Sequence, residues 1–327
     1  MPVRVAVIGV GAPWFHLPAL SRLPDVALAG LCDIDEVRLQ EAGRTYGVNA
    51  LFTDYGPMLD RVGPQAVFVL PSVMRTVEVA TQCLDRGLHV FVEKPPGIRA
   101  EETRQLARVA RSRGVLSMVG FNRRFHPLVA AAREVIARTG PPSAIIAEWW
   151  KPLLMDDMAR SFPVTVLEHL LSVTTIHSVD LLRFLGGDVD GIQAMGGRSY
   201  SPYLDAVYAL LRFKTGGTGI LLSDYHTTKL ERLQLHGKGW LVELSGTDSP
   251  YREGRVFERG AWSPLKIHAG ERTDPDGFFD EDQHFIACVA AGRRVGPQGS
   301  DLEDAVRTME LAEAIEAAAR SGTEVPR

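Results

Sequence analysis

A glycine turn between two apolar segments constrains this chain more than any other feature. Residues 3–8 are apolar and rich in valine and isoleucine, and Gly9-Val10-Gly11 follows them directly. A second apolar segment, residues 26–32, ends at Asp33. In this arrangement glycines let the backbone approach a pyrophosphate, and the acid binds the ribose hydroxyls. The pattern predicts a dinucleotide-binding site at the start of the chain.

The segments that follow continue an alternation of strands and helices. Strands are predicted over residues 66–70, 88–92 and 115–120, and helices over residues 35–46, 74–86 and 101–113. Continuous apolar strands that alternate with helices indicate a parallel sheet covered on both faces. Because this alternation fades near residue 125, we expect a Rossmann domain with a doubly wound sheet over residues 1–122.

Residues 123–327 predict a second domain of the α/β class. Helices are expected over residues 128–138 and 165–185, and strands over residues 143–150, 190–200, 205–213, 217–226, 231–236 and 239–244. Short strands separated by glycine turns favour a mostly antiparallel or mixed sheet. An apolar stripe predicts a last helix over residues 301–320, with Ser300 and Glu303 as a capping box, in a position to pack back on the first domain.

The dinucleotide fingerprint departs from its usual form at its third glycine, which is Trp14 here. Pro18 is tolerated only in the first turn of a helix, so the helix after the loop should begin near Phe15. We therefore expect a long phosphate loop, residues 9–15, with Trp14 either packed elsewhere or lining the cofactor cleft. The residues assigned to the cofactor are Gly9, Gly11, Ala12, Pro13, Trp14, Asp33, Leu70, Pro71, Glu93, Lys94 and Asn122.

Asp33 also predicts which nicotinamide cofactor the domain binds. A carboxylate at this position repels a 2′-phosphate, and no arginine follows it directly. These features favour NAD. Arg38, one helical turn further on, keeps NADP as the less favoured alternative.

Composition excludes several other classes of protein. A formal net charge of −4 provides no basic surface for nucleic acid or an anionic membrane. No segment has the length of a membrane-spanning helix and the N-terminus lacks the pattern of a signal peptide, so we expect a cytoplasmic protein. Cys32, Cys83 and Cys288 lie far apart and are expected to be buried thiols. The acidic residues between Asp274 and Asp282 predict a solvated loop, and no metal site is expected.

Four further motifs resemble those of the Gfo/Idh/MocA family of oxidoreductases, and in this order and spacing they cover nearly the whole chain. They are Glu93-Lys94-Pro95 after the fourth strand, Gly120-Phe121-Asn122-Arg123-Arg124-Phe125 at the domain junction, His177-Ser178-Val179-Asp180 on a helix, and Glu303-Asp304-Ala305 on the last helix, which ends at Ser321-Gly322. The resemblance implies a C-terminal α/β domain built on a large open sheet, with the substrate held between that domain and the nicotinamide.

Members of the family mostly oxidise or reduce a secondary alcohol of a sugar, polyol or related small molecule. The resemblance therefore implies that Lys94 lies by the nicotinamide and the substrate hydroxyl, and that His177 transfers a proton. This agrees with the chemistry. Hydride leaves a carbinol carbon only as its hydroxyl loses a proton, which a histidine accepts, while a lysine stabilises the alkoxide. Lys94 is one of only six lysines, so a chance occurrence after the fourth strand is improbable.

Four residues are candidates for substrate contact: Arg123, Trp150, Lys151 and Asp180. Stacking of an indole on a sugar ring is one interpretation of Trp149-Trp150, and core packing is the slightly favoured alternative. Glu168-His169 is expected on a helix surface. The chain departs from the family at Val173, where an acid commonly stands one turn before the histidine, and at Arg75, where histidine is common.

These features together predict an NAD-dependent oxidoreductase that acts on a sugar, a polyol or a hydroxylated ring compound. Two alternatives remain. One is a lyase or glycosidase that retains its cofactor and uses a transient oxidation. The other is a non-catalytic NAD(P)-binding sensor, which Val173 suggests. Because an open sheet with an uncovered face usually needs a partner, we expect a homodimer or a homotetramer.

Overall fold

The computed structural model describes residues 1–11, 15–152, 160–247, 251–267 and 276–322. The chain forms two compact units, one of Met1–Asn122 with Gly277–Arg307 and one of Arg123–Asp276 with Thr308–Arg327. The sequence had suggested that everything after residue 122 belongs to the second domain. Residues 277–307 instead belong to the first unit.

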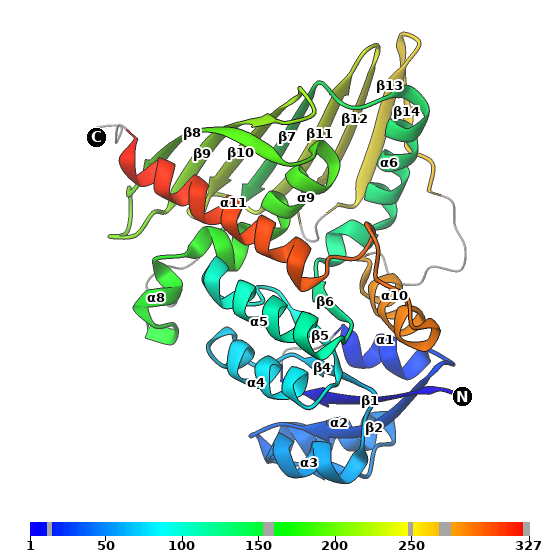
Figure 1. The fold of residues 1–327 in the computed structure, drawn as a ribbon. Helices are drawn as coiled ribbons and strands as arrows, with labels where there is room; N and C mark the ends of the chain where they lie inside the picture. Colours follow the sequence, from blue (N-terminus) through cyan, green and yellow to red (C-terminus); the bar gives the residue numbers. More distant parts are fainter. Residues whose placement is uncertain (12–14, 153–159, 248–250, 268–275, 323–327) are drawn as a thin grey trace. The chain divides into compact units, whose positions relative to one another are not determined.

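The first unit is built on a parallel sheet in the order β3-β2-β1-β4-β5-β6 (Figure 1). Its strands are β1 (Val3–Ile8), β2 (Val26–Cys32), β3 (Leu51–Phe52), β4 (Ala66–Val69), β5 (His89–Glu93) and β6 (Ser117–Gly120). Its helices are α1 (His16–Arg22), α2 (Glu36–Tyr46), α3 (Tyr55–Val62), α4 (Val73–Asp85), α5 (Ala100–Arg113) and α10 (Phe278–Ala291). The predicted Rossmann fold is confirmed. The strand order reverses between β1 and β4, where ligands of such sheets bind.

Three elements of this unit were not expected from the sequence: β3, α3 and α10. Strand β3 has only two residues, too few for a period to show. Helix α10 begins in the acidic segment that we had predicted to be a solvated loop. That prediction is wrong for Glu281 and Asp282, whose side chains are fully buried. Residues 274 and 275 lie outside the described residues.

The last helix, α11 (Leu302–Ser321), carries the chain from the first unit into the second. Its cap differs from the predicted one by one residue. The carboxylate of Asp301 accepts the backbone N–H of Asp304 at 2.8 Å, whereas the Ser300 hydroxyl donates to the Asp304 side chain at 3.0 Å. Both residue types cap helices well, so a sequence with the two in succession does not decide which one caps.

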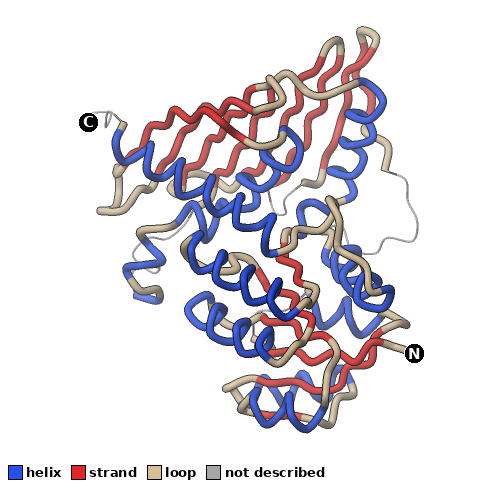
Figure 2. The backbone as a smooth tube through the Cα atoms, in the orientation of Figure 1, coloured by secondary structure: helices blue, strands red, loops and turns tan. Residues whose placement is uncertain are grey.

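The second unit is built on a mixed eight-stranded sheet in the order β14-β13-β12-β11-β7-β10-β9-β8, which Figure 2 shows as one layer. Its strands are β7 (Ala144–Trp150), β8 (Val189–Gly197), β9 (Ala206–Phe213), β10 (Thr218–Asp224), β11 (Leu230–Gly237), β12 (Trp240–Gly246), β13 (Glu253–Glu258) and β14 (Ala261–Pro264). All neighbours are antiparallel except β7 and β10, which run parallel. Strands β13 and β14 were not predicted.

Helices cover one face of this sheet. They include α6 (Pro127–Thr139) and α9 (Ile176–Gly186), and α6 packs on β12 while α9 packs on β7 and β10. Side chains along β7 alternate between buried and half-buried, as expected when only one face is covered. The half-buried face carries both polar and apolar side chains and includes an ion pair between Arg232 and Glu148 at 3.2 Å.

The helix predicted over residues 165–185 forms three pieces: α8 (Val164–Leu167), the π-helix η2 (Leu171–Thr175) and α9. Within η2 the Thr174 hydroxyl donates back to the Leu170 carbonyl at 2.7 Å. The Thr175 hydroxyl is 2.9 Å from the Ser223 hydroxyl and 2.8 Å from that of Tyr225, all of them buried. Such hydroxyl contacts compete with regular helical bonding, and π segments of this kind are frequent at functional sites.

None of the helices in the described part of the chain is both long and apolar enough to cross a bilayer. Among the described residues, no three His, Cys, Asp or Glu side chains gather in a way that could hold a metal ion. The three cysteines are free and buried, as expected.

Candidate active site

Gly9 forms the turn between β1 and the phosphate loop. Its φ angle is +91°, and a Cβ atom there would lie 2.5 Å from the Leu70 carbonyl oxygen at the end of β4. Its N–H donates to the Cys32 carbonyl at the end of β2 at 2.8 Å. Only glycine tolerates both this conformation and this close approach. The turn therefore lies at the carboxyl ends of β1, β2 and β4, where the sequence had placed the cofactor.

The Asp33 carboxylate is fixed against this turn. Its Oδ2 accepts the backbone N–H of Val10 at 2.7 Å, and its Oδ1 accepts the N–H of Asp35 at 2.9 Å. A glycine turn with an oriented acid beside it is the arrangement that suits a dinucleotide, because the turn approaches the pyrophosphate and the acid approaches the ribose. The described residues therefore fit a nicotinamide dinucleotide.

Arg38 lies beside the same turn. Its Nε donates to Asp35 Oδ2 at 2.7 Å, and its guanidinium lies so close to the Cα of Gly11 that any side chain there would collide with it. The ion pair between Arg38 and Asp35 is exposed, so Asp35 restrains the guanidinium only weakly. A cation beside Asp33 is the feature that keeps NADP as the less favoured alternative.

The helix after the phosphate loop begins at His16, next to the expected residue, Phe15. Pro18 then stands in its first turn, where proline is tolerated. The ring of Phe15 stacks on that of Phe278 in α10, with centroids 4.3 Å apart. Three residues assigned to the cofactor, Ala12, Pro13 and Trp14, lie outside the described residues.

Lys94 directly follows β5 and is half-buried. Its neighbour Glu93 pairs with Gly120 on β6, and a Cβ atom at Gly120 would lie 2.5 Å from Glu93 Oε2. Asn122 follows β6 and is buried, while Leu70 and Pro71 follow β4. Because adjacent parallel strands end at the same edge, these predicted residues and the Gly9 turn share one edge of the sheet.

His16 is a residue of this site that the sequence interpretation missed. It is buried, with Nδ1 2.8 Å from Asp282 Oδ1 and Nε2 3.3 Å from Glu93 Oε2. Burial by itself lowers the pKa of His16, but the Asp282 and Glu93 carboxylates together raise it well above its usual value. The sequence feature that could have identified His16 is its position as a polar residue at the start of a helix with an apolar face. Its partner Asp282 lies in the acidic segment for which we predicted a solvated loop.

His177, the predicted proton carrier, belongs to the second unit and is the second residue of α9. It is buried, with 6% of its surface exposed. Val173, four residues earlier, lies in the π-helix η2. A different carboxylate contacts the residues just before η2 and within it. Glu316 on α11 lies 3.0 Å from His169 Nδ1 and accepts the N–H of Leu171 at 3.1 Å. His169 is thus buried, contrary to the surface position that we expected for it.

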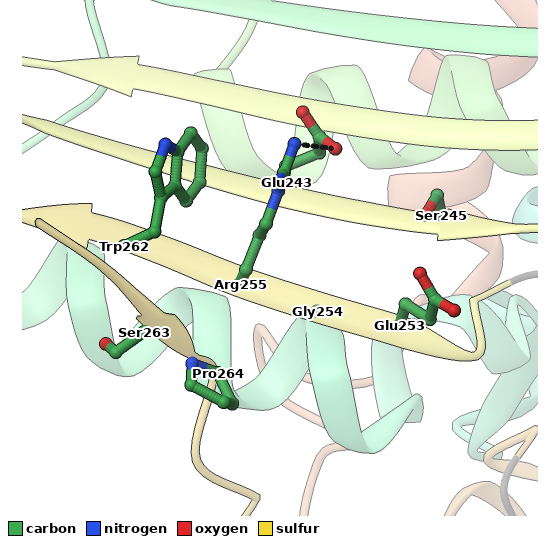
Figure 3. A pocket seen from close by; sticks show the side chains of 8 residues that line it. All are labelled: Glu243, Ser245, Glu253, Gly254, Arg255, Trp262, Ser263 and Pro264. Carbon is green, nitrogen blue, oxygen red and sulfur yellow. Dashed lines mark hydrogen bonds and ion pairs between the residues drawn. The ribbon is translucent and has the colours of Figure 1, made fainter.

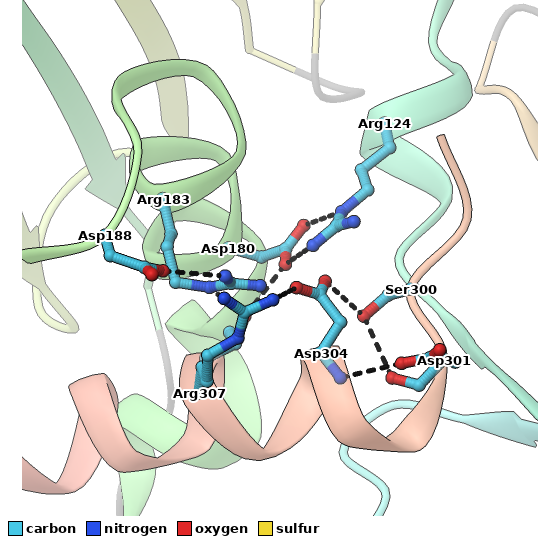
Figure 4. A network of polar contacts seen from close by, with 9 residues as sticks. Arg124, Asp180, Arg183, Asp188, Ser300, Asp301, Asp304 and Arg307 are labelled. Carbon is cyan, nitrogen blue, oxygen red and sulfur yellow. Dashed lines mark hydrogen bonds and ion pairs between the residues drawn. The ribbon is translucent and has the colours of Figure 1, made fainter. Parts of the chain in front are cut away.

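Asp180 is fully buried in a polar network (Figure 4). Arg124 donates to both of its oxygens, at 2.6 and 2.7 Å, and the Thr308 hydroxyl donates to Oδ1 at 3.1 Å. Arg183 extends the network through Thr308 at 3.1 Å. The sequence had suggested Asp180 as a substrate residue. Because it has no exposed surface and both oxygens have protein partners, we propose a structural role for it instead.

Arg123 and Lys151 lie near one another in the second unit. Arg123 Nη2 is 3.6 Å from Glu231 Oε2, and Glu231 pairs with Trp149 across β11 and β7. The Lys151 ammonium lies 5.5 Å from the centroid of the Trp149 ring. Burial lowers the pKa of Lys151; the Glu231 carboxylate opposes this shift, while Lys229 and Arg123 add to it.

The two adjacent tryptophans point to opposite faces of the sheet. Trp149 is buried in a cluster with Leu170 and Tyr225, which agrees with the core packing that we favoured. Trp150 lies on the half-buried face, and its indole N–H donates to Glu148 Oε2 at 2.8 Å. The structure therefore does not bring Trp150 together with the neighbours of Arg123 and Lys151 on the covered face.

A hollow of about 450 Å³ lies on β12, β13 and β14 (Figure 3). It is lined by Glu243, Ser245, Glu253, Gly254, Arg255, Trp262, Ser263 and Pro264. Arg255 is paired with Glu243 at 3.0 Å and lies 4.3 Å from the centroid of the Trp262 ring. None of the predicted site residues lines this hollow, so it does not belong to the candidate active site.

Comparisons with known proteins agree with a dinucleotide-binding fold. Residues 3–121 match the Gfo/Idh/MocA family model, which is described as an oxidoreductase family with an NAD-binding Rossmann fold. The chain is 25% identical over 346 residues to the scyllo-inositol 2-dehydrogenase (NAD(+)) of Bacillus subtilis, covering 99% of this chain and 96% of that protein. It is 26% identical over 339 residues to the D-apiose dehydrogenase of Paraburkholderia graminis, covering 95% of this chain and 85% of that protein.

A solved structure shares the fold of the whole chain. The aldose-aldose oxidoreductase from Caulobacter crescentus, complexed with glycerol, aligns with a TM-score of 0.87 at 19% identity and covers 99% of both chains. The fingerprint turn, the Glu-Lys-Pro motif and the two-unit fold agree with these matches. Residues 3–121 match the model of the Gfo/Idh/MocA family of oxidoreductases, and the whole chain is similar to dehydrogenases such as the scyllo-inositol 2-dehydrogenase.

Proposed function

We propose that the protein is an NAD-dependent dehydrogenase that transfers hydride between the nicotinamide and a secondary alcohol or ketone of a sugar, a polyol or a related hydroxylated compound. One observation carries this proposal: the Gly9 turn, closed against Leu70, holds the Asp33 carboxylate at the same sheet edge from which Lys94 emerges. The inositol and apiose dehydrogenases among its relatives support the substrate class.

The residues have distinct roles in this proposal. The cofactor, when bound, accepts or supplies the hydride. Lys94 donates a hydrogen bond to the reacting oxygen and stabilises its developing negative charge. His177 takes the hydroxyl proton during oxidation and returns it during reduction. Arg123 and Lys151 bind substrate hydroxyl or acidic groups.

Val173 supports a second candidate function. Val173 stands where the family commonly has an acid, one turn before His177, so this position supplies no carboxylate to the histidine. A protein that binds NAD and has lost turnover, as a sensor would, fits this feature. The two candidates differ in one observable, which is turnover of a bound alcohol or ketone.

A fluorescence titration with NADH and with NADPH tests the proposal first. We expect saturable binding that prefers NADH and weakens at least about 10-fold in Asp33→Ala, because the ribose loses its acceptor. A screen of scyllo-inositol, D-apiose and further polyols and aldoses with NAD⁺ follows. Binding without turnover on the whole panel would favour the sensor. If the folded protein binds neither nucleotide, both candidates are wrong.

We also propose that the protein is a homodimer or a homotetramer with no nucleic-acid or membrane partner. The half-buried face of the eight-stranded sheet supports self-association. Met195 on β8, Leu210 on β9 and Trp262 on β14 are large apolar side chains exposed by 43% or more. A net charge of −4 gives no support to an anionic partner.

A further inference from the structure

His16 is a polar residue in an apolar environment at the first position of α1. Its side chain is 4% exposed. The rings of Phe68, Phe91 and Phe278 surround it, with centroids 5.8, 5.1 and 5.4 Å away. Burying an imidazole among phenyl rings costs free energy unless its nitrogens are bonded. Its position therefore depends on the contacts that those nitrogens make.

Both ring nitrogens face carboxylates. Nδ1 lies 2.8 Å from Asp282 Oδ1 in α10, and Nε2 lies 3.3 Å from Glu93 Oε2 in β5. A neutral imidazole has one N–H and donates to one of them, whereas an imidazolium donates to both. Among the described residues these are the two charged groups that face the ring, and α1, β4, β5 and α10 otherwise contribute phenyl groups. The imidazolium form satisfies both carboxylates at once, and the raised pKa of His16 favours this form.

The two carboxylates differ in environment. Asp282 is fully buried, so its link to His16 fastens α10 to the Rossmann unit. Glu93 is 31% exposed and precedes Lys94 directly. Its Oε2 lies over the Cα of Gly120, where a side chain would displace it. Because Gly120 has no side chain, it leaves a slot for the Glu93 carboxylate, and His16 contacts that carboxylate in the slot through Nε2.

We propose that His16 is a positioning residue for the proposed reaction: its imidazolium holds the Glu93 carboxylate in this slot and so fixes the orientation of Lys94. This inference rests on the proposed function, because it assigns Lys94 to the reacting oxygen. A misplacement of a catalytic group by about 1 Å can cost about 100-fold in rate. His16 does not contact the substrate in this proposal and acts through Glu93.

Two amide variants separate this role from a structural one. The amide nitrogen of Asn occupies the place of Nδ1 and that of Gln the place of Nε2. His16→Asn therefore keeps the bond to Asp282 and loses Glu93, and His16→Gln does the reverse. We expect kcat to fall at least about 10-fold in His16→Asn and to stay within about threefold in His16→Gln. Thermal stability should follow the opposite order, because His16→Gln leaves the fully buried Asp282 without its donor.

A purely structural role would give the same order for kcat and for the melting temperature, and that result would overturn the proposal. His89→Asn is the matched control. His89 stands at the other end of β5 and accepts the Leu116 N–H at 3.0 Å, so its loss should leave kcat unchanged. The dissociation constant for NADH should change less than threefold in all three variants.

A second readout needs no turnover and so separates this inference from the proposed function. Lysines are methylated with ¹³C-formaldehyde, and the Lys94 signal is assigned by its absence in Lys94→Arg. We expect the titration of Lys94 to shift in His16→Asn and to match the wild type in His16→Gln. If the wild type turns over no compound on the panel, the proposed function fails while this titration still tests the positioning. An identical Lys94 titration in both variants would disprove it.

Discussion

Two lysines have proposed roles in the chemistry. Lys94 emerges from the sheet edge that carries the glycine turn, and Lys151 lies in the other unit beside Arg123 and Glu231. Only six lysines occur in the chain, so both positions are unusual. The two should affect different kinetic constants, because one is assigned to the reacting oxygen and the other to substrate contact.

Replacement of Lys94 by Ala should reduce kcat by about 100- to 1000-fold, because the developing alkoxide loses its hydrogen-bond donor. The NADH dissociation constant should stay within threefold of the wild type. Steady-state kinetics and a fluorescence titration measure the two quantities. An equal loss of cofactor affinity would mean that Lys94 serves binding and not the chemical step.

The lowered pKa of Lys151 predicts a pH dependence of KM. The ammonium is lost as pH rises through this pKa, and this happens at a lower pH than for an exposed lysine. KM should therefore rise at alkaline pH while kcat changes little. Lys151→Arg keeps its charge and should abolish the rise, and Lys151→Met should show a high KM at every pH. A wild-type KM independent of pH would argue against substrate contact.

At the scale of the elements, strands proved easier to predict than contacts. Apolar segments such as residues 66–70 and glycine turns such as that at Gly9 indicate a Rossmann sheet through local signals alone. Helix α10 escaped prediction because Asp282 looks solvated in sequence and is buried only by its tertiary link to His16. The sequence likewise could not show that Asp180 faces Arg124.

The π-helix was beyond prediction for a related reason. Its threonine hydroxyls have partners on β10 and just after it, far along the chain, at Ser223 and Tyr225. A short stretch of sequence around η2 does not include these partners, so it cannot predict the contacts. Side-chain chemistry therefore suggests candidate residues, while the tertiary fold decides which of them meet.

The network that holds α9 predicts a large loss of stability on one substitution. Asp180→Asn keeps the side-chain shape but leaves the buried Arg124 guanidinium without its counter-ion, which should cost about 3–5 kcal/mol of unfolding free energy. The control is Asp188→Asn, which removes a more exposed partner of Arg183 and should cost less than about 1 kcal/mol. Urea unfolding measures both. An unchanged stability with a raised KM in Asp180→Asn would restore Asp180 as a substrate residue.

At the scale of the whole molecule, the uncovered sheet face predicts self-association. Light scattering coupled to size exclusion should give two or four times the chain mass of 35.8 kDa. Leu210→Asp places a charge on an exposed apolar position of β9 and should shift the protein towards a monomer. A monomeric wild type at micromolar concentration would contradict the proposal.

The burial of the cysteines has a practical consequence for labelling this protein with fluorescent dyes. Burial raises the pKa of the Cys32 and Cys83 thiols to about 12 and also raises that of Cys288. Thiolates, which react with maleimide dyes, are therefore scarce in the native protein at neutral pH. One cysteine introduced on the surface of each unit would then carry nearly all of the label. Single-molecule energy-transfer measurements during turnover can thus use the wild-type sequence with these two added cysteines and with no native cysteine removed.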